Sequence, residues 1–148
     1  MPSRAKLFGH PIHPILIVFP LGLFAMAVIF DIVQLVTGNP NLSLAAYYMI
    51  GAGIITGLLA AVFGLIDWTG IVPQSRARSI GVWHGLGNVV VVLLFAISWW
   101  LRKPNPVTPS GGALTASYLG VLLGLVTGWL AGELVFRHGV GVEGPPQG

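Results

Sequence analysis

The chain has 148 residues, of which 55% are hydrophobic and 7% are charged, and its formal net charge is +3. Soluble domains contain about 25% charged residues, so this chain has too few charges to cover a water-exposed surface, and we expect it to lie in a lipid bilayer. It has no cysteine, which excludes disulfides, thiolate-held iron–sulfur clusters and a cysteine nucleophile. The seven basic residues fall at the edges of apolar runs rather than along a stripe, which argues against a nucleic-acid partner.

Four apolar segments follow one another, and each is long enough to cross about 30 Å of hydrocarbon as a helix. They run over about residues 14–36, 44–66, 80–101 and 114–136. We therefore predict an all-α, polytopic membrane protein, a bundle of four transmembrane helices with its N- and C-termini on the same side. The single domain spans residues 7–138, and we expect residues 1–6 and 139–148 to be flexible tails.

The first segment begins with the stretch GHPIHP, residues 9–14, in which both histidines precede a proline. A residue before proline avoids the α conformation, so we expect the helix to start at or after Pro14, with His13 near its N-cap and His10 outside it. The sequence AMA at residues 25–27 resembles a signal-peptide cleavage site. The apolar run continues past it to Val36, which favours a membrane helix.

The basic residues predict the orientation of the bundle. Because the spans alternate in direction, the N-terminus, the loop at residues 67–79 and the C-terminus share one side. By the positive-inside rule we expect this side to be cytoplasmic, since it carries five of the seven basic residues, namely Arg4, Lys6, Arg76, Arg78 and Arg137.

Glycines recur every four residues in the fourth segment, at Gly120, Gly124, Gly128 and Gly132. Such a stripe lets a neighbouring helix approach closely. Three explanations stay open at this point: packing within one bundle, a homo-oligomer seam, and clearance for a flat cofactor such as a porphyrin.

The polar residues of the chain converge on the predicted cytoplasmic end, where helix alternation places all four histidines and two of the four acidic residues. Ionisable groups at membrane depth are costly, which makes them candidates for function. The candidate cofactor ligands are His10, His13, His84 and His138, and the candidate metal ligands are the same histidines together with Asp67 and Glu133.

Each candidate also has a purely structural explanation. His84 could bond to a backbone carbonyl or to Asn88, one turn further along the same helix face, and His13 could simply cap its helix. Asp67 could pair with Arg76 or Arg78, and Glu133 with Arg137 at i+4.

One acidic residue, Asp31, stands apart from this cluster. It lies four to five turns into the first helix, toward the opposite interface. There the side chain of Arg102 or Lys103 could reach it.

Several short motifs together resemble a known family: residues 9–14 with 19–22, Gly64 with Asp67, His84-Gly85 with Asn88, residues 132–135, and residues 137–142. The chain is similar over residues 7–142 to the predicted bacterial membrane proteins grouped as domain of unknown function 2231. The resemblance implies a compact four-helix unit of the bacterial inner membrane. Some members look fused to Rieske-type or cytochrome c domains, which implies electron transfer. The motif residues of the family correspond to His10, His13, His84, His138, Asp67 and Glu133.

We expect a small integral membrane protein with a histidine site that binds haem b or a metal ion in a redox role, together with a redox protein partner. Haem would use an axial pair such as His13 with His84, or a pair from His10 and His138. A Zn²⁺ or Fe²⁺ ion would use histidine nitrogen and carboxylate oxygen. The alternatives are a proton or cation transporter or channel component, and a structural membrane subunit. No nucleophile with a base, phosphate loop or HExxH motif indicates an enzyme.

Overall fold

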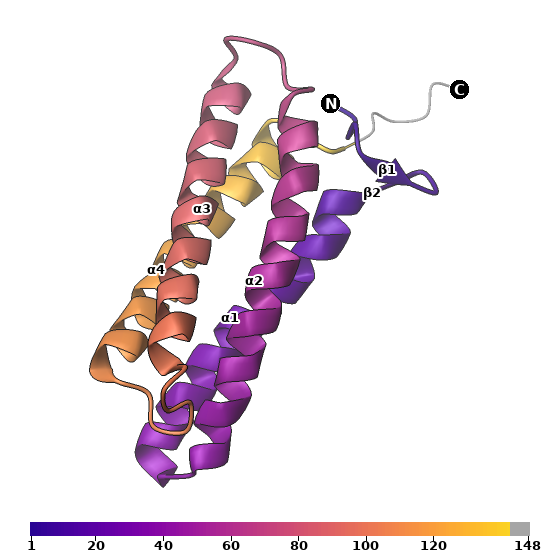
Figure 1. Ribbon diagram of the computed structural model, residues 1–148. Coiled ribbons are helices and arrows are strands. Elements are labelled where there is room, and N and C mark those ends of the chain that lie inside the picture. Colours follow the sequence, from indigo (N-terminus) through magenta and orange to yellow (C-terminus); the bar gives the residue numbers. More distant parts are fainter. Residues whose placement is uncertain (143–148) are drawn as a thin grey trace.

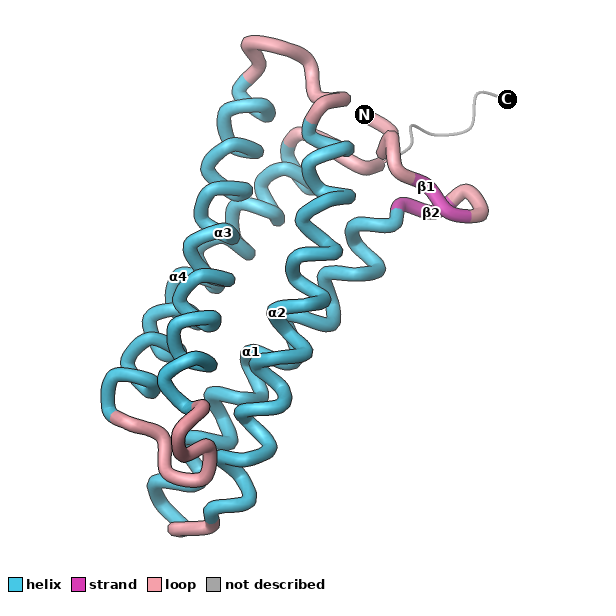
Figure 2. Tube along the Cα trace, viewed as in Figure 1, coloured by secondary structure: helices cyan, strands magenta, loops and turns pink. Residues whose placement is uncertain are grey.

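Four long helices make up most of the computed structural model, which describes residues 1–142 (Figure 1). This confirms the predicted all-α bundle of four membrane-length helices. Two short strands form a small hairpin before the first helix, and the start and end of the described chain lie at the same end of the bundle (Figure 2). The elements are β1 (Lys6–Leu7), β2 (His10–Pro11), α1 (Ile12–Thr37), α2 (Pro40–Trp68), α3 (Arg76–Arg102), α4 (Gly111–Gly132) and a π-helix, η1 (Glu133–Arg137).

The helices begin earlier than the apolar runs predict. In α2, α3 and α4 the side-chain oxygens of Asn39, Ser75 and Ser110 accept a hydrogen bond from a backbone N–H of the first turn, which extends each helix beyond its apolar run. The first helix begins at Ile12 instead of Pro14. A proline within the first turn is tolerated because the N–H that it lacks would have no partner inside the helix.

The helices pack as two antiparallel hairpins, α1 with α2 and α3 with α4, and the contact between the hairpins is less extensive than the contact within each. In the middle of the bundle the rings of Phe24 on α1 and Phe95 on α3 stack with their centroids 3.9 Å apart. Glycines make room for both rings. A Cβ on Gly53 would lie 2.5 Å from Phe24, and one on Gly120 would lie 2.8 Å from Phe95.

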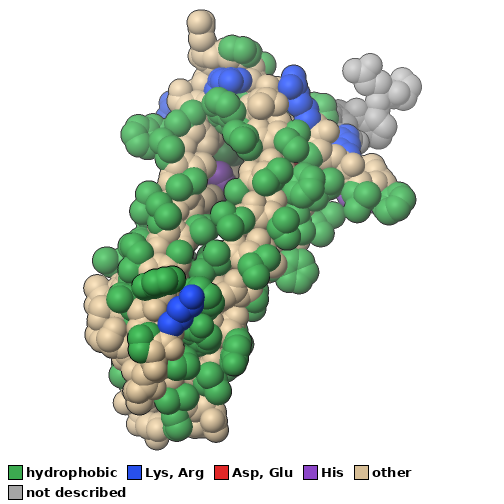
Figure 3. Space-filling view, in the orientation of Figure 1, with side chains coloured by type: hydrophobic (Ala, Val, Ile, Leu, Met, Phe, Trp, Pro, Cys, Tyr) green, Lys and Arg blue, Asp and Glu red, His purple; other side chains and the backbone are tan. Residues whose placement is uncertain are grey.

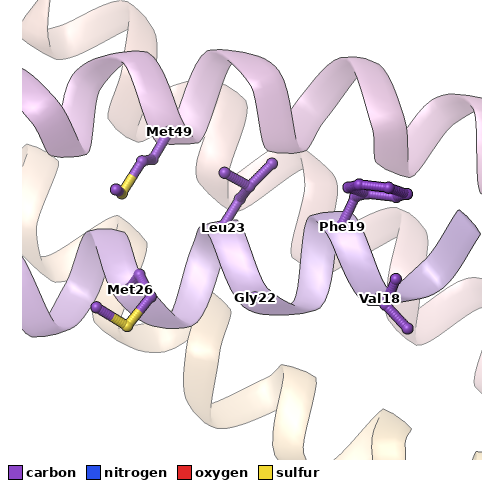
Figure 4. A pocket seen from close by; sticks show the side chains of 6 residues that line it. All are labelled: Val18, Phe19, Gly22, Leu23, Met26 and Met49. Carbon is purple, nitrogen blue, oxygen red and sulfur yellow. The ribbon is translucent and has the colours of Figure 1, made fainter.

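The outer surface of the bundle is apolar over most of its length, and most of the visible basic side chains lie at one end (Figure 3). Each of the four helices is long and apolar enough to cross a membrane, so the chain is an integral membrane protein. A shallow hollow of about 300 Å³ lies on this surface between α1 and α2 (Figure 4). Its lining suits a lipid acyl chain and consists of Val18, Phe19, Gly22, Leu23, Met26 and Met49.

The glycine stripe of α4 contacts another helix at Gly120, which packs against Phe95. A Cβ on Gly124 or on Gly128 would meet no atom within 4 Å, and one on Gly132 would meet only Phe136 of η1. Packing within the bundle therefore explains Gly120. The homo-oligomer seam stays a prediction, centred on Gly124 and Gly128.

Candidate functional site

The four histidines lie toward one end of the bundle, which we call the histidine end; it holds the start of α1, the loop between α2 and α3, and η1. Two of them lie outside the four long helices. His10 is exposed on β2, and its Nδ1 hydrogen-bonds to the carbonyl of Phe8 at 3.0 Å. His138 sits in the turn that follows η1. The other two, His13 and His84, are partly buried on the helices.

The ring of His13, in the first turn of α1, lies against Gly64 of α2. Its Nδ1 donates a hydrogen bond of 2.8 Å to the backbone carbonyl of Ala60, one turn earlier on α2. The ring reaches this carbonyl because Gly64 has no side chain, and a Cβ there would lie 2.9 Å from Cε1 of the imidazole. Since a carbonyl only accepts, the neutral ring carries its proton on Nδ1 and has its lone pair on Nε2.

The ring of His84, on α3, is held by both of its nitrogens. Its Nδ1 donates to the backbone carbonyl of Thr127 on α4 at 2.9 Å, and Nε2 accepts from the side-chain amide of Asn88 at 3.0 Å. The Thr127 hydroxyl in turn donates to Oδ1 of Asn88 at 2.9 Å. Both structural partners predicted for His84, a carbonyl and Asn88, are therefore confirmed.

Contacts at two levels fix the register between α2 and α3, which belong to different hairpins. A side-chain atom of Val92 lies 3.5 Å from the place of a Cβ on Gly57, and an atom of Trp68 lies 2.8 Å from the place of a Cβ on Gly81. Between these two levels, the same register sets Gly64 of α2 opposite the first turns of α3 that follow Gly81.

His13 and His84 consequently lie at the same depth on opposite hairpins, since His13 covers Gly64. At this depth Gly85 of α3 is exposed, and a Cβ there would meet no atom within 4 Å. A histidine side chain is visible in the hollow between α2 and α3 (Figure 3).

Asp67, at the end of α2, binds the segment that the sequence predicts to be a flexible tail. Its Oδ1 accepts hydrogen bonds from the Ser3 hydroxyl at 2.7 Å, the Arg4 backbone N–H at 2.8 Å and the Ala5 backbone N–H at 3.0 Å. Of the second predicted tail, residues 143–148 lie outside the described residues. The carboxylate of Asp67 is thus occupied by the N-terminal segment.

The remaining charged candidates pair along the chain. Arg78, a predicted partner of Asp67, instead donates to the carbonyl of Ile71 at 2.9 Å and lies 4.1 Å from the ring centre of Trp68. The predicted pair between Glu133 and Arg137 is present, with 3.2 Å between Oε1 and Nη1. Both side chains thus have partners of their own.

The structure does not assemble the six-residue metal set that the sequence suggests. Within residues 1–142, no three histidine, aspartate or glutamate side chains come together in a group that could hold a metal ion. The axial pair His13 with His84 is brought to one level of the bundle. His10 and His138 remain outside the helices.

A second polar cluster lies at the other end, which we call the ion-pair end. Asp31 and Arg102 form two hydrogen bonds of 2.9 and 2.6 Å, and neither side chain is exposed. Arg102 also donates to the hydroxyls of Ser98 at 3.1 Å and Ser117 at 3.4 Å. Arg102 is therefore the partner of Asp31, whereas the Lys103 ammonium lies over two tryptophan rings.

The sequence did not predict the role of Thr127 as a hydrogen-bond partner or the packing of the His13 imidazole on Gly64. Thr127 is buried in an apolar span, which is a signal that a polar partner is near, but its partner could not be identified without the packing of α3 on α4. The glycines at residues 64 and 85 are visible in the sequence as small residues, yet only the helix register brings them to one depth.

Four apolar spans with a polar site between them at one end define a polytopic integral membrane protein. The chain belongs to the family described as Predicted membrane protein (DUF2231), whose sequence model matches residues 9–144. The resemblance seen in the sequence motifs is thereby confirmed. No curated protein and no solved structure matches the chain.

Proposed function

We propose that this protein binds haem b between its two hairpins through His13 and His84 and transfers electrons in the membrane. One observation carries the proposal: the two imidazoles lie at one depth on opposite hairpins, each with Nδ1 bonded to a backbone carbonyl of its own hairpin. Metal-bound histidines are oriented by such second bonds, which leave Nε2 as the coordinating atom. Haem ligands in helical bundles come from facing helices in the same way.

The space around the two rings supports a flat ligand. Gly64 lies beneath His13, and Gly85 follows His84 and has open space where a side chain would be. Neither hydrogen bond that orients the rings crosses from one hairpin to the other. A ligand between the hairpins would therefore leave both of these bonds in place.

The number of nearby donors favours haem over a bare ion. A porphyrin supplies most of the iron ligands itself, so the protein needs to add only the axial pair. A Zn²⁺ or Fe²⁺ ion usually takes three or four protein ligands, and residues 1–142 offer no group of three. An ion bound by histidine and carboxylate is the weaker form of the proposal.

Iron coordination by His84 would displace the Asn88 amide, which now donates to Nε2. If His13 and His84 both held the haem iron, no position would remain for O₂, and the group would supply electron transfer. Such a role also needs a redox protein partner to supply or accept the electron.

A second candidate function, a proton relay, is favoured by the same hydrogen bonds. The Thr127 hydroxyl, the Asn88 amide and the His84 ring form a connected polar chain inside the membrane. Such chains are typical of proton pathways in transporters. Proton flux into liposomes that is lost in His84→Ala, from protein that contains no haem, would support this candidate.

We further propose that the histidine end faces the cytoplasm. Of the two basic residues near the other end, Arg102 is buried against Asp31, so it does not act as a free loop charge. This strengthens the charge asymmetry that orients membrane proteins. A green fluorescent protein fused to the C-terminus should fluoresce, and a dark fusion at a position where a fused alkaline phosphatase is active would contradict the orientation.

The haem proposal is tested on protein purified in detergent from cells with ample haem. We expect a reduced-minus-oxidised spectrum with Soret and α bands, and we expect His13→Ala and His84→Ala each to lose them. His10→Ala and His138→Ala are the matched controls and should keep the bands. A parent protein without bands would exclude haem, and metal analysis of the same preparation would then test the ion.

A further inference from the structure

We infer that the ligand of the His13–His84 site enters sideways from the lipid, between α2 and α3, and that residues 1–5 close the site against water. We call residues 1–5 the N-terminal strap. The inference rests on the proposed function only in taking these two histidines as the ligand site. It assigns the ligand to one chemical class, flat and largely apolar molecules dissolved in the bilayer.

One side of the strap is fastened to the first hairpin. Oδ1 of Asp67 accepts three hydrogen bonds from the strap, given above, and the Arg4 guanidinium donates to the Thr69 hydroxyl at 3.2 Å. The carbonyl of Ala5 accepts a hydrogen bond of 3.0 Å from the backbone N–H of Ile12, the first residue of α1. The strap is thus tied to both helices of this hairpin.

The other side of the strap is fastened to the chain that follows the second hairpin. The carbonyl of Met1 accepts from the Gly141 backbone N–H at 2.8 Å, and the Met1 nitrogen donates to the carbonyl of Gly139 at 2.6 Å. The Met1 side chain also packs on a buried cluster of Ile71, Ala77 and Leu134. The strap therefore bridges both hairpins at the end where they would meet water (Figure 1).

The side of the site between α2 and α3 is open in comparison. Gly85 is exposed, and a side chain there would meet no atom within 4 Å. Val82 and Val89, three residues before and four residues after Gly85 on the same side of α3, are apolar and 39% and 54% exposed. A surface of this kind at membrane depth faces acyl chains, so a molecule that arrives here comes from the lipid.

The chain lacks cysteine, so single cysteines report access without background labelling. Gly85→Cys would be placed in liposomes and treated with a lipid-soluble maleimide or with a sulfonated, membrane-impermeant maleimide present on both sides. Ile55→Cys, 63% exposed near the middle of α2, is the control for a lipid-facing position. Val72→Cys, 57% exposed in the loop between α2 and α3, is the control for a water-facing position.

We expect the lipid-soluble reagent to label Gly85→Cys about as fast as Ile55→Cys, and the sulfonated reagent to label Gly85→Cys at least about tenfold more slowly than Val72→Cys. Equal rates of labelling by the sulfonated reagent in Gly85→Cys and Val72→Cys would overturn lateral entry. Labelling of Ile55→Cys without labelling of Gly85→Cys by the lipid-soluble reagent would overturn it as well.

The strap is tested by Asp67→Ala in the Gly85→Cys background. Loss of the three bonds should raise labelling by the sulfonated reagent about tenfold, whereas Asp67→Asn keeps an oxygen acceptor and should stay near the parent rate. Ser3→Ala, which removes one bond, gives an intermediate rate if Asp67→Ala fails to elute as a folded protein. Unchanged labelling in folded Asp67→Ala and Ser3→Ala would overturn the role of the strap. All these rates are measured on protein prepared without haem, so a missing haem spectrum leaves this inference intact.

Discussion

At the ion-pair end, Asp31 and Arg102 join the two hairpins through two hydrogen bonds and neither side chain is exposed. At the histidine end, His13 and His84 each bond within their own hairpin, and open space remains beside them. A buried charge in lipid is tolerated only when its bonds are complete, as they are for this ion pair. The ion-pair cluster thus stabilises the bundle, whereas the histidine cluster is the one that we propose to bind a ligand.

The largest loss of stability is expected from removing one member of the ion pair. Asp31→Ala leaves the Arg102 guanidinium buried without its carboxylate, which should cost about 3–5 kcal/mol of stability. The apparent melting temperature in detergent measures this loss.

The control replaces both charges at once. Asp31→Leu with Arg102→Leu leaves no unpaired charge and should recover most of the lost stability. If Asp31→Ala alone melts at the parent temperature, the ion pair does not stabilise the bundle and the contrast between the two ends fails.

The next largest effect, on haem binding, is expected at Gly64, against which the His13 ring packs. Gly64→Ala places a Cβ 2.9 Å from the imidazole, so the ring must leave the Ala60 carbonyl. Loss of such an orienting bond typically weakens metal binding about 10- to 100-fold, and we expect haem retention on dilution to fall within that range. Gly57→Ala, whose Cβ would lie at an ordinary 3.5 Å from Val92, should bind like the parent. Equal losses of haem retention in Gly64→Ala and Gly57→Ala would mean that the orientation of the His13 ring does not affect haem binding.

Asn88→Ala tests whether Nε2 of His84 is free to bind a ligand. It removes the amide that competes for Nε2, so haem should bind several-fold more tightly, while the lost hydrogen bond to Thr127 lowers stability by about 0.6 kcal/mol. Haem titration of the apoprotein and thermal melting measure the two effects separately. Weaker haem binding in a folded variant would show that Asn88 supports the ligand instead of competing with it.

The smallest effects are expected among the serines around Arg102. Ser98 accepts from Nε at 3.1 Å and donates to the Ala113 carbonyl at 2.7 Å, so Ser98→Ala should cost about 1 kcal/mol. Ser117 lies 3.4 Å from the guanidinium, and Ser117→Ala should change the melting temperature much less. A larger loss of stability in Ser117→Ala than in Ser98→Ala would show that the longer contact of Arg102 supports the ion pair more than the shorter one.

The fold could be predicted from the sequence because an apolar run of membrane length has one way to satisfy its backbone in lipid, the helix. Local pairs were equally accessible, since Glu133 and Arg137 stand at i+4 and pair as expected. The alternation of the spans predicted Arg102 or Lys103 as the partner of Asp31, and the structure shows that it is Arg102. In contrast, the partners of Asp67 come from residues 3–5, a segment too polar and short for a pattern to reveal.

The sequence alone determined that the chain lies in the membrane, how many times it crosses, and which end holds its histidines, because hydropathy and alternation act along the chain. Only the tertiary structure decided that His13 and His84 share one depth, that His10 and His138 stay outside the helices, and that Asp31 and Arg102 are wholly buried. Those outcomes depend on the rotation and register of each helix against its neighbours. Rotation and register are set by side-chain packing between distant residues, such as Trp68 against Gly81 and Phe24 against Phe95, which no local pattern encodes.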